Sequence, residues 1–519
     1  MAFSKIFSRD TLLFKKKNKN RNKLFSGDLP ELIYDIIKYF QNDFSTLHSC
    51  ILVNRLWCRI TIPLLWENPF SIPTNNYKFI EFYLNNLNDE LKTKLNEYKV
   101  IDNLLNSNTL FNYLSFIKCL NICRIVNFID KWSGDILRTS KLENRDSESN
   151  FKKLIQTSLF KTFIENELHT LEIEILTDSF YLDDIFELIL QNTNSIHNIK
   201  NLTLSCYSNT LINNRILQVI NSINSHQNLK KIVLYYEISL LYKSLFKDYN
   251  CSNTLNTIIF SGVNLKHIIN LEKVFEQLNV LESVHIIYCY SFDTSFIQQI
   301  INLTKPFKLK SLFIEDKLEI NESLQLLLHK YGNCIENFGI RIYCYSFYEQ
   351  QLLELITKYC KNIKFFHTYD IYIHPEMIHT HLLFNFIKNI KHNLNYLTII
   401  CGRLSISSIL LQNLGQVLPY KLEYLNLQLD INASDFKVFL KNSKGTFIKE
   451  LLIINCMHDD NILPYIKKYI MKKKRVKYLS FRTNGKELFD LNDEVKEFKL
   501  YGIRVQKYCN NRQFIHFIN

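Results

Sequence analysis

The stretch LEYLNLQ, residues 422–428, alternates apolar and polar side chains in the pattern of a short β-strand. Because successive side chains of a strand point to opposite faces, Leu425 and Leu427 share one face of it. Tyr424, Asn426 and Gln428 share the other face. A lone strand of this kind leaves its apolar face open to water. The stretch therefore predicts neighbouring strands of the same type.

The pattern of the first six residues, with apolar side chains at positions one, four and six, recurs along the chain. It begins at residues 168, 199, 229, 255, 281, 309, 335, 363, 394, 422, 448 and 476, with an earlier member at 117 and a last one at 495. From 168 to 476, successive members are 26 to 31 residues apart. A period of this size is typical of stacked supersecondary units.

Segments with apolar residues at helical spacing lie between the predicted strands, as in IINLEKVFEQL (268–278) and EQQLLELITKYC (349–360). One strand and one helix bury their apolar faces only against neighbouring units, so stacking predicts a curved α/β (or α+β) solenoid with inner parallel strands and outer helices. The array resembles the leucine-rich-repeat family, whose unit opens L-x-x-L-x-L followed by Asn or Cys. Cys289 and Cys456 occupy that last position.

The repeat pattern is irregular at both ends. The interval from 117 to 168 contains the polar stretch SKLENRDSESN (140–150), which predicts an exposed loop or insertion, with a degenerate repeat as the alternative. The last interval, from 476 to 495, is only 19 residues long. The terminal stretch YCNNRQFIHFIN (508–519) is expected to form a cap, because the end of a solenoid must shield its last unit.

Residues 28–70 follow a different pattern. In LPELIYDIIKYF (29–40) the apolar residues fall at offsets 0, 3, 4, 7, 8 and 11, which predicts an amphipathic helix of about three turns. Asp28 offers an N-cap acceptor, and Pro30 lies in the first turn. Further helices are expected within 44–53 and 55–66. Three short helices are too few for a self-sufficient core, so they need a partner or an adjoining domain.

This stretch resembles the F-box family, and the whole chain is similar in style to the expanded F-box and leucine-rich-repeat families of fungi. The matching residues are Leu29, Pro30, Ile36, Ile37, Asp43, Phe44, Val53, Arg55, Trp57, Leu65 and Trp66. In that family the motif docks onto the Skp adaptor of a cullin-based ubiquitin ligase, and the repeats usually select the substrate. The resemblance implies adaptor contact through Leu29, Pro30, Ile36, Val53 and Trp57. Alternatively, several of these side chains form the core between the helices, and Trp57 is internal.

Aromatic residues flank the apolar positions of several predicted strands. They are Phe313, Phe365, His367, Tyr369, Tyr396, Tyr424 and Tyr478, and neighbouring units add Lys231, Glu315, Arg341 and Arg482. Aromatic side chains on a concave face are common in protein recognition because they bury a large area at low entropic cost. The aromatics thus indicate a substrate surface centred on Phe365, Tyr396 and Tyr424. The competing explanation is that they only follow β-propensity.

The expected domain organisation is a basic tail (1–27), an F-box (28–70), a helical linker or cap (71–115) and a repeat solenoid (116–519). The net charge is +13, part of which lies in KKKNKNRNK (15–23) and IKKYIMKKKRVK (466–477). Either cluster could contact phosphate or serve as a nuclear address, but a solvated tail and a solvated helix end explain them more simply. We therefore do not expect nucleic acid as a partner.

No catalytic motif is visible: the P-loop, GxGxxG, HExxH and GxSxG patterns do not occur. With 10 glycines and 8 prolines among 519 residues, a sandwich, a barrel or a glycine-rich nucleotide fold is not expected. His374, Glu376, His379 and His381 could be drawn as a metal site, but ordinary surface or packing histidines are favoured. Thus we expect no enzyme, no cofactor and no metal.

Thirteen cysteines without a CxxC pair indicate reduced thiols, and Cys119 and Cys123 are expected to be such buried thiols. No signal peptide is visible, and the most apolar run, Leu404–Tyr420, is interrupted by polar residues. The chain is therefore expected inside the cell, in the cytoplasm, the nucleus or both, and not in a membrane. The favoured function is substrate recognition for a ubiquitin ligase. The alternative is a protein-interaction scaffold that serves no ligase.

Overall fold

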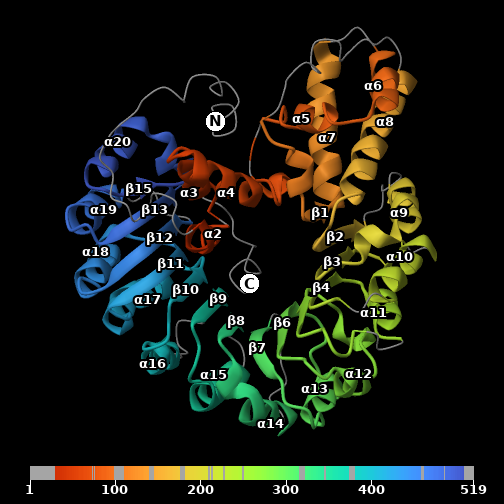
Figure 1. Ribbon diagram of the computed structural model, residues 1–519. Coiled ribbons are helices and arrows are strands. Elements are labelled where there is room, and N and C mark those ends of the chain that lie inside the picture. The colour runs from red at the N-terminus through yellow and green to blue at the C-terminus, as the bar shows by residue number, and fades with distance from the viewer. Residues whose placement is uncertain are drawn as a thin grey trace. The chain divides into compact units, whose positions relative to one another are not determined.

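The computed structural model describes residues 30–41, 43–72, 74, 76–98, 110–139, 145–175, 182–208, 211, 214–225, 228–247, 251–314, 322–343, 347–372, 380–456, 461–483 and 485–507 (Figure 1). The chain divides into two compact units. The first comprises Met1–Leu255 with Leu278–Val280, and the second comprises Asn256–Gln277 with Leu281–Asn519. Both units combine parallel strands with helices in a solenoid-like α/β arrangement.

The described part of the first unit begins with helices. Their bounds are α2 (Pro30–Lys38), α3 (Phe44–Ile51), α4 (Arg55–Leu65), the short 3-10 turn η2 (Pro69–Ser71), α5 (Ile80–Leu84), α6 (Asp89–Asn96) and the 3-10 turn η3 (Tyr113–Phe116). Asp43 caps α3 by accepting a hydrogen bond from the Thr46 backbone N–H at 3.0 Å, and the Asn54 side chain accepts from the Trp57 backbone N–H to cap α4. The predicted N-cap Asp28 lies outside the described residues.

Two long helices, α7 (Ile122–Thr139) and α8 (Arg145–Ile164), fill the interval in which the sequence predicted a loop. A loop was the wrong expectation for residues 145–150, which form the first turns of α8, whereas the alternative of an insertion stays a prediction. Residues 140–144 lie outside the described residues. The Gln156 amide donates to Asp130 at 3.2 Å and links the two helices. A polar sequence is compatible with a helix because one face of α8 stays in water.

Among the described residues of the first unit, the sheet contains the parallel strands β1 (Cys119–Asn121), β2 (Thr170–Ile175), β3 (Asn201–Cys206) and β4 (Lys231–Tyr236). Helices α9 (Leu182–Gln191), α10 (Asn214–Ser225) and α11 (Ser239–Leu245) follow the strands. Leu171, Leu202 and Ile232 stand side by side in the register of β2 to β4, and all three are completely buried. The second apolar position of the repeat therefore builds the core between sheet and helices.

The second unit repeats this arrangement. Its parallel strands are β5 (Thr257–Ser261), β6 (Ser283–Cys289), β7 (Lys308–Ile314), β8 (Asn337–Tyr343), β9 (Phe365–Tyr372), β10 (Tyr396–Cys401), β11 (Lys421–Leu429), β12 (Phe447–Asn455) and β13 (Val476–Thr483). Its helices are α12 (Leu271–Gln277), α13 (Thr294–Ile301), α14 (Glu322–Tyr331), α15 (Phe347–Tyr359), α16 (Thr380–Ile390), α17 (Leu404–Val417), α18 (Ala433–Asn442), α19 (Leu463–Ile466) and α20 (Asn492–Leu500).

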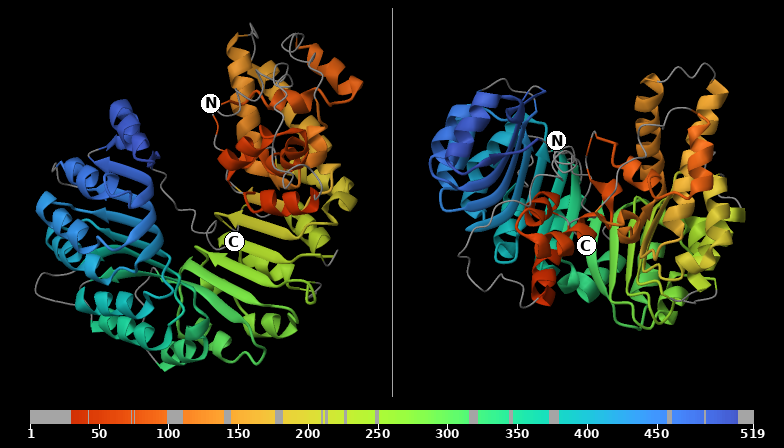
Figure 2. Two further views of the ribbon diagram at one scale, coloured as in Figure 1. Left: turned by 60° about the vertical axis from the view of Figure 1, so that its left-hand side comes forward. Right: turned by 45° about the horizontal axis from the view of Figure 1, so that its top comes forward.

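The apolar positions form continuous buried ladders. Leu397, Leu425, Leu451 and Leu479 pair in register across β10 to β13, and none has any exposed surface. A fully buried leucine contributes about 1.5–3 kcal/mol relative to an exposed one. In each unit the helices cover one face of the sheet, which leaves the other face to the residues between the apolar positions (Figures 1 and 2).

The end of the sheet differs from the sequence prediction. Two short strands, β14 (Lys486–Glu487) and β15 (Arg504–Val505), both pair with β13. The apolar pattern at 495–500 was expected to be another strand, but it lies in α20. Apolar residues spaced by three, such as Val495 and Phe498, also suit one side of a helix, and Phe498 is buried there. The terminal stretch 508–519 lies outside the described residues.

Candidate functional site

Helices α2, α3 and α4, called here the three-helix module, expose many large apolar side chains. Ile33 and Ile37 of α2 are buried, whereas Leu32 and Ile36 are 54% and 42% exposed. The exposed set, called here the docking surface, consists of Leu32, Tyr34, Ile36, Tyr39, Leu52 and Val53. Soluble proteins rarely expose so many apolar side chains in so short a segment unless a partner covers them. The docking surface is therefore the strongest candidate for a protein interface in the described part of the chain.

The residues predicted for adaptor contact take different positions in this module. Pro30 is exposed at the start of α2, Ile36 and Val53 belong to the docking surface, and Trp57 of α4 is half-buried. Leu29 lies outside the described residues. The charge near the surface is mixed, with Glu31 in the first turn of α2 and the Lys38 ammonium 5.8 Å from the Tyr34 ring centroid. The exposed side chains of the module are thus mainly apolar, with charged residues of α2 near them.

The residues that follow α4 are buried against the rest of the first unit. Trp66, directly after α4, and Phe70 in η2 are 1% and 2% exposed. The ring centroid of Trp66 lies 4.2 Å from that of Tyr113, and that of Phe70 lies 5.8 Å from Phe163 of α8. These rings belong to an aromatic cluster that anchors the module to the rest of the first unit. Trp66, part of the sequence motif, is therefore a structural residue here.

Polar contacts reinforce this anchor. The Gln41 side chain donates to the Glu67 carboxylate at 2.6 Å, and the Glu67 backbone carbonyl accepts from the backbone N–H of Lys118 at 3.0 Å. Burial raises the pKa of Glu67, an effect that the nearby charges of His169, Lys38 and Lys118 partly offset. Fixed between the module and the residues leading into β1, Glu67 helps hold the docking surface in one orientation.

On the inner face of the second unit, the predicted substrate aromatics come together in two rows. Phe365, Tyr396 and Tyr424 pair in register across β9 to β11, and the next strands add Glu450, Tyr478 and Arg504. Phe313 and His367 belong to the adjoining row, with Gly339 between them. Ring centroids in the first row are 6.0 Å apart for Phe365 and Tyr396, and 6.3 Å apart for Tyr396 and Tyr424.

Most of these aromatic side chains are buried, whereas a substrate surface would expose them to solvent. Phe313, Phe365 and Tyr424 are at most 4% exposed, whereas Tyr396 and Tyr478 are half-buried. Close packing between rings on neighbouring strands accounts for this burial. Tyr396 and Tyr478 are therefore the aromatics of the row that a partner can reach. The side chain of Tyr369 and the whole of Glu315 lie outside the described part of the structure.

His367 is held within this face. Its Nδ1 lies 2.5 Å from the Tyr288 hydroxyl at the end of β6, three strands away. The Phe313 ring lies over Gly339, where an added Cβ would come within 2.1 Å of the ring. Burial lowers the pKa of His367 to about 3, so the imidazole is neutral. His367 is thus a packing residue of the sheet.

Sequence reasoning missed Glu450, Arg504 and Tyr288. Glu450 lies between Tyr424 and Tyr478 in the register, and burial raises its pKa. The Arg504 guanidinium lies 5.8 Å from the centroid of the Tyr478 ring. No repeat hexamer includes Arg504 or Tyr288, so only the pairing of strands could reveal their proximity. Glu450 could have been found, since it follows Lys449 in IKELLI at an inner position.

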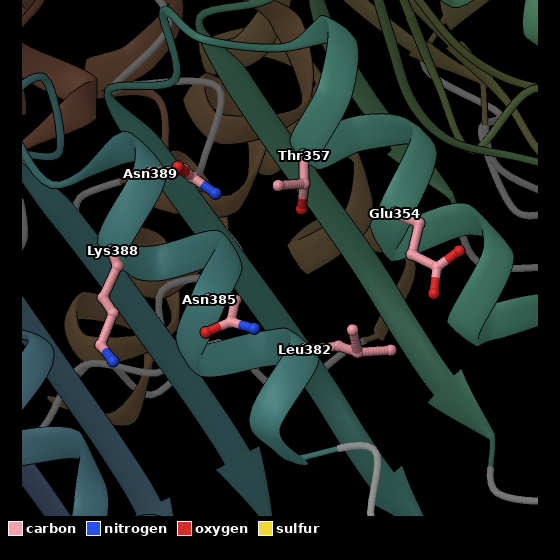
Figure 3. Close-up of a pocket in the computed structure, with 6 residues that line it drawn as sticks. All are labelled: Glu354, Thr357, Leu382, Asn385, Lys388 and Asn389. Atoms are coloured by element: carbon pink, nitrogen blue, oxygen red, sulfur yellow. The ribbon is translucent and has the colours of Figure 1, made fainter.

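The described residues contain no group of three or more His, Cys, Asp or Glu side chains placed to bind a metal. His374, Glu376 and His379 lie outside these residues, and His381 is exposed. The same described part contains no helix long and apolar enough to span a bilayer. A hollow between α15 and α16 is lined by Glu354, Thr357, Leu382, Asn385, Lys388 and Asn389 (Figure 3). We interpret it as the groove that two adjacent helices leave between them.

Comparisons with known proteins give little information about the function of this chain. No protein-family model matches the chain, and no curated protein matches it. Among solved structures, it is similar to a chain in the crystal structure of the Rad7 and Elc1 complex in yeast. The identity is 15% and the TM-score 0.33, over 69% of this chain and 78% of that one. A similarity this weak carries no argument about function, which has to come from the residues of this chain.

Proposed function

We propose that this protein is the substrate-recognition subunit of a Skp–cullin–F-box ubiquitin ligase. In this proposal the three-helix module is an F-box that docks a Skp-family adaptor, and the repeats are divergent leucine-rich repeats that hold a protein substrate. The observation that carries the proposal is the exposure of Ile36 and Val53, two motif positions, within the apolar docking surface. A partner that covers these side chains gains the free energy of removing them from water.

The role that we propose for this chain is not catalytic. It would bring a substrate close to the ubiquitin-transferring subunits, which raises the effective concentration of the substrate without supplying a reacting group. On this basis we place the protein inside the cell, where the ubiquitin system and reduced thiols are found. Tyr396 and Tyr478, with Glu450 between Tyr424 and Tyr478, are the candidate substrate contacts on the inner face of the second unit.

The proposal is tested by capture of the full-length chain on an immobilised Skp-family adaptor. Replacing Ile36 and Val53 with glutamate (Ile36→Glu with Val53→Glu) should reduce capture at least about tenfold, because a buried charge at an apolar interface costs more than 1.4 kcal/mol. The matched control is Leu326→Glu on α14, where the leucine is 46% exposed and lies far from the module in sequence. Its capture should equal that of the wild type.

Two outcomes contradict the proposal. If the wild-type chain is not retained on the adaptor, the scaffold without a ligase becomes the better explanation. If the double variant is retained as well as the control, the docking surface is not the adaptor interface. A second arm compares proteins that co-purify with the wild type and with Tyr396→Ser/Tyr478→Ser. If the same proteins co-purify with both, the inner face is not the substrate surface. The proposal of adaptor docking would not be affected.

A further inference from the structure

A pair of exposed tyrosines lies at the carboxyl ends of β3 and β4 in the first unit, outside the surfaces described above. Tyr207 directly follows β3, and Tyr236 is the last residue of β4. Their rings are stacked, with centroids 4.6 Å apart and planes 24° from parallel. They are nevertheless 50% and 38% exposed. Two large rings that stack on each other yet stay open to solvent form a ready aromatic platform.

The backbone at Tyr236 is in an uncommon conformation. Its φ is +63°, in the left-handed region that a bulky side chain rarely adopts. The next residue is fixed, because the Glu237 backbone N–H donates to the Cys206 carbonyl at 2.8 Å. Such a conformation costs about 1–3 kcal/mol and persists only where neighbouring structure enforces it. Here it directs a tyrosine onto Tyr207.

Carboxylates lie on β2 and directly after β4. The charged side chains on β2, β3 and β4 are Glu172 near the middle of β2, Glu174 near its carboxyl end, and Lys231 at the amino end of β4. In the register, Ser205 of β3 separates Glu174 from Tyr235 of β4, so a small side chain lies between the acidic strand and the aromatic strand. Glu237 follows directly after Tyr236. The strand ends next to the platform thus carry acidic residues, in a chain whose net charge is +13.

The pKa values of the tyrosines reflect their burial and the nearby carboxylates of β2. Burial, the Tyr236 hydroxyl and the Glu174 carboxylate together raise the pKa of Tyr207 to about 12. Burial and the Glu172 carboxylate likewise raise the pKa of Tyr235. Glu172 accepts a hydrogen bond from the Asn121 side chain. Glu174 forms no ion pair with any residue that the structure describes.

We propose that Tyr207, Tyr236, Glu174 and Glu237 form a binding surface for a partner segment that presents arginine side chains. A guanidinium stacks on tyrosine rings and forms paired hydrogen bonds to carboxylates, so arginine side chains suit both the rings and the carboxylates of the surface. Because the surface contains two carboxylates, it favours a partner segment with positive charge. This surface is independent of adaptor docking by the three-helix module, and it adds a second protein contact to the chain.

The test measures binding of the full-length chain to a fluorescein-labelled peptide, GSRGRSG, by fluorescence anisotropy. The matched peptide GSQGQSG lacks the guanidinium groups. We expect the arginine peptide to bind at least about tenfold more tightly than the glutamine peptide, since charged hydrogen bonds and ring stacking are both lost. Glu174→Gln and Tyr207→Leu/Tyr236→Leu should each remove most of this difference. Binding should also weaken as salt is raised.

The controls are Tyr420→Leu, which removes an exposed tyrosine elsewhere, and Glu90→Gln, which removes an exposed carboxylate of the same unit. Both should bind like the wild type. Equal affinity for the two peptides, or unchanged binding by the Glu174 and tyrosine variants, would overturn the proposal. Binding that appears only after residues 1–27 are deleted would also overturn it, because the basic segment 15–23 of this chain would then be the occupant. Loss of Skp capture would not affect any of these results.

Discussion

At the scale of single residues, His367 shows how a polar side chain is accommodated in the sheet. The sequence suggested a substrate contact, but the imidazole is 6% exposed and its Nδ1 is paired with the Tyr288 hydroxyl. Transfer of a charged imidazole into this site is unfavourable, which is why burial lowers its pKa to about 3. The neutral ring instead contributes one hydrogen bond and its packing to the inner face.

This burial predicts a specific pH dependence. The unfolded chain binds a proton at His367 below about pH 6.5, whereas the folded chain does not until about pH 3. Acidification therefore favours the unfolded state, and the histidine should lower the free energy of unfolding by up to about 1.4 kcal/mol per pH unit between these values. Urea unfolding at pH 7, 6 and 5 should show a shallower loss of stability for His367→Gln.

His392→Gln provides the control, because His392 is exposed after α16. Its stability profile should follow that of the wild type. A His367→Gln profile as steep as that of the wild type would mean that the buried imidazole is not the source of the acid sensitivity.

At the scale of elements, the distance between neighbouring helices depends on small residues. Gly415 of α17 faces α18, where an added Cβ would lie 2.7 Å from the Phe439 carbonyl oxygen and 2.9 Å from the Ser443 backbone nitrogen. Both contacts are with backbone, which cannot rotate out of the way. By contrast, a Cβ added at Gly134 of α7 meets nothing within 4 Å. Two helical glycines thus have opposite surroundings.

Alanine substitutions should therefore change stability in opposite directions. Gly415→Ala should lower the free energy of unfolding by about 1–3 kcal/mol, because α17 and α18 must move apart. Gly134→Ala should raise it by about 0.5–1 kcal/mol, since glycine is a poor helix former and the added methyl group has room. Thermal unfolding followed by circular dichroism measures both. A Gly415→Ala variant as stable as the wild type would show that the two helices do not pack this closely.

Whether the last apolar hexamer forms a strand or a helix also depends on its environment in the folded chain. The hexamer at 495 has the same apolar spacing as those that form strands, yet it lies in α20. Positions one and four of the repeat are three residues apart, so they suit a helix as well as the approach to a strand. Only the sixth position distinguishes a strand, in which it would be buried, from a helix. In the hexamer at 495 this position is Leu500, which is 85% exposed.

At the scale of the whole molecule, the two ends of the three-helix module serve different purposes. The α2 end and the end of α3 expose apolar side chains, whereas Trp66 and Phe70 are packed into the aromatic cluster of the first unit. The module is thus fixed at one end and open at the other. A short helical unit without its own core can be stable in this way, because the adjoining residues complete its core.

The two tryptophans of the module should therefore separate stability from binding. Trp66→Ala should cost about 3–5 kcal/mol of stability, as removal of a fully buried aromatic side chain usually does. Trp57→Ala should cost much less, because its side chain is only half-buried, yet it should weaken adaptor capture. Urea unfolding and the adaptor pull-down, carried out on both variants, give the two readouts. Equal destabilisation by the two substitutions would contradict this division.

The sequence alone determined the repeat and most of its elements. The spacing of 26 to 31 residues located β2 to β13, because stacking against neighbours of the same type leaves a regular apolar pattern in each repeat. Helical spacing in LPELIYDIIKYF similarly predicted the helix that the structure gives as α2. Both features depend on local periodicity, which is a property of adjacent residues and is therefore visible in a single chain.

Tertiary structure decided which side chains are accessible. Phe365, Tyr396 and Tyr424 occupy equivalent repeat positions, yet Tyr396 is half-buried and the other two are buried, because each ring is covered by its own neighbours on adjacent strands. The contacts between Tyr288 and His367, 79 residues apart, and between Tyr207 and Tyr236 arise from strand register and chain folding. Burial and long-range contact depend on residues distant in sequence, and no local pattern encodes them.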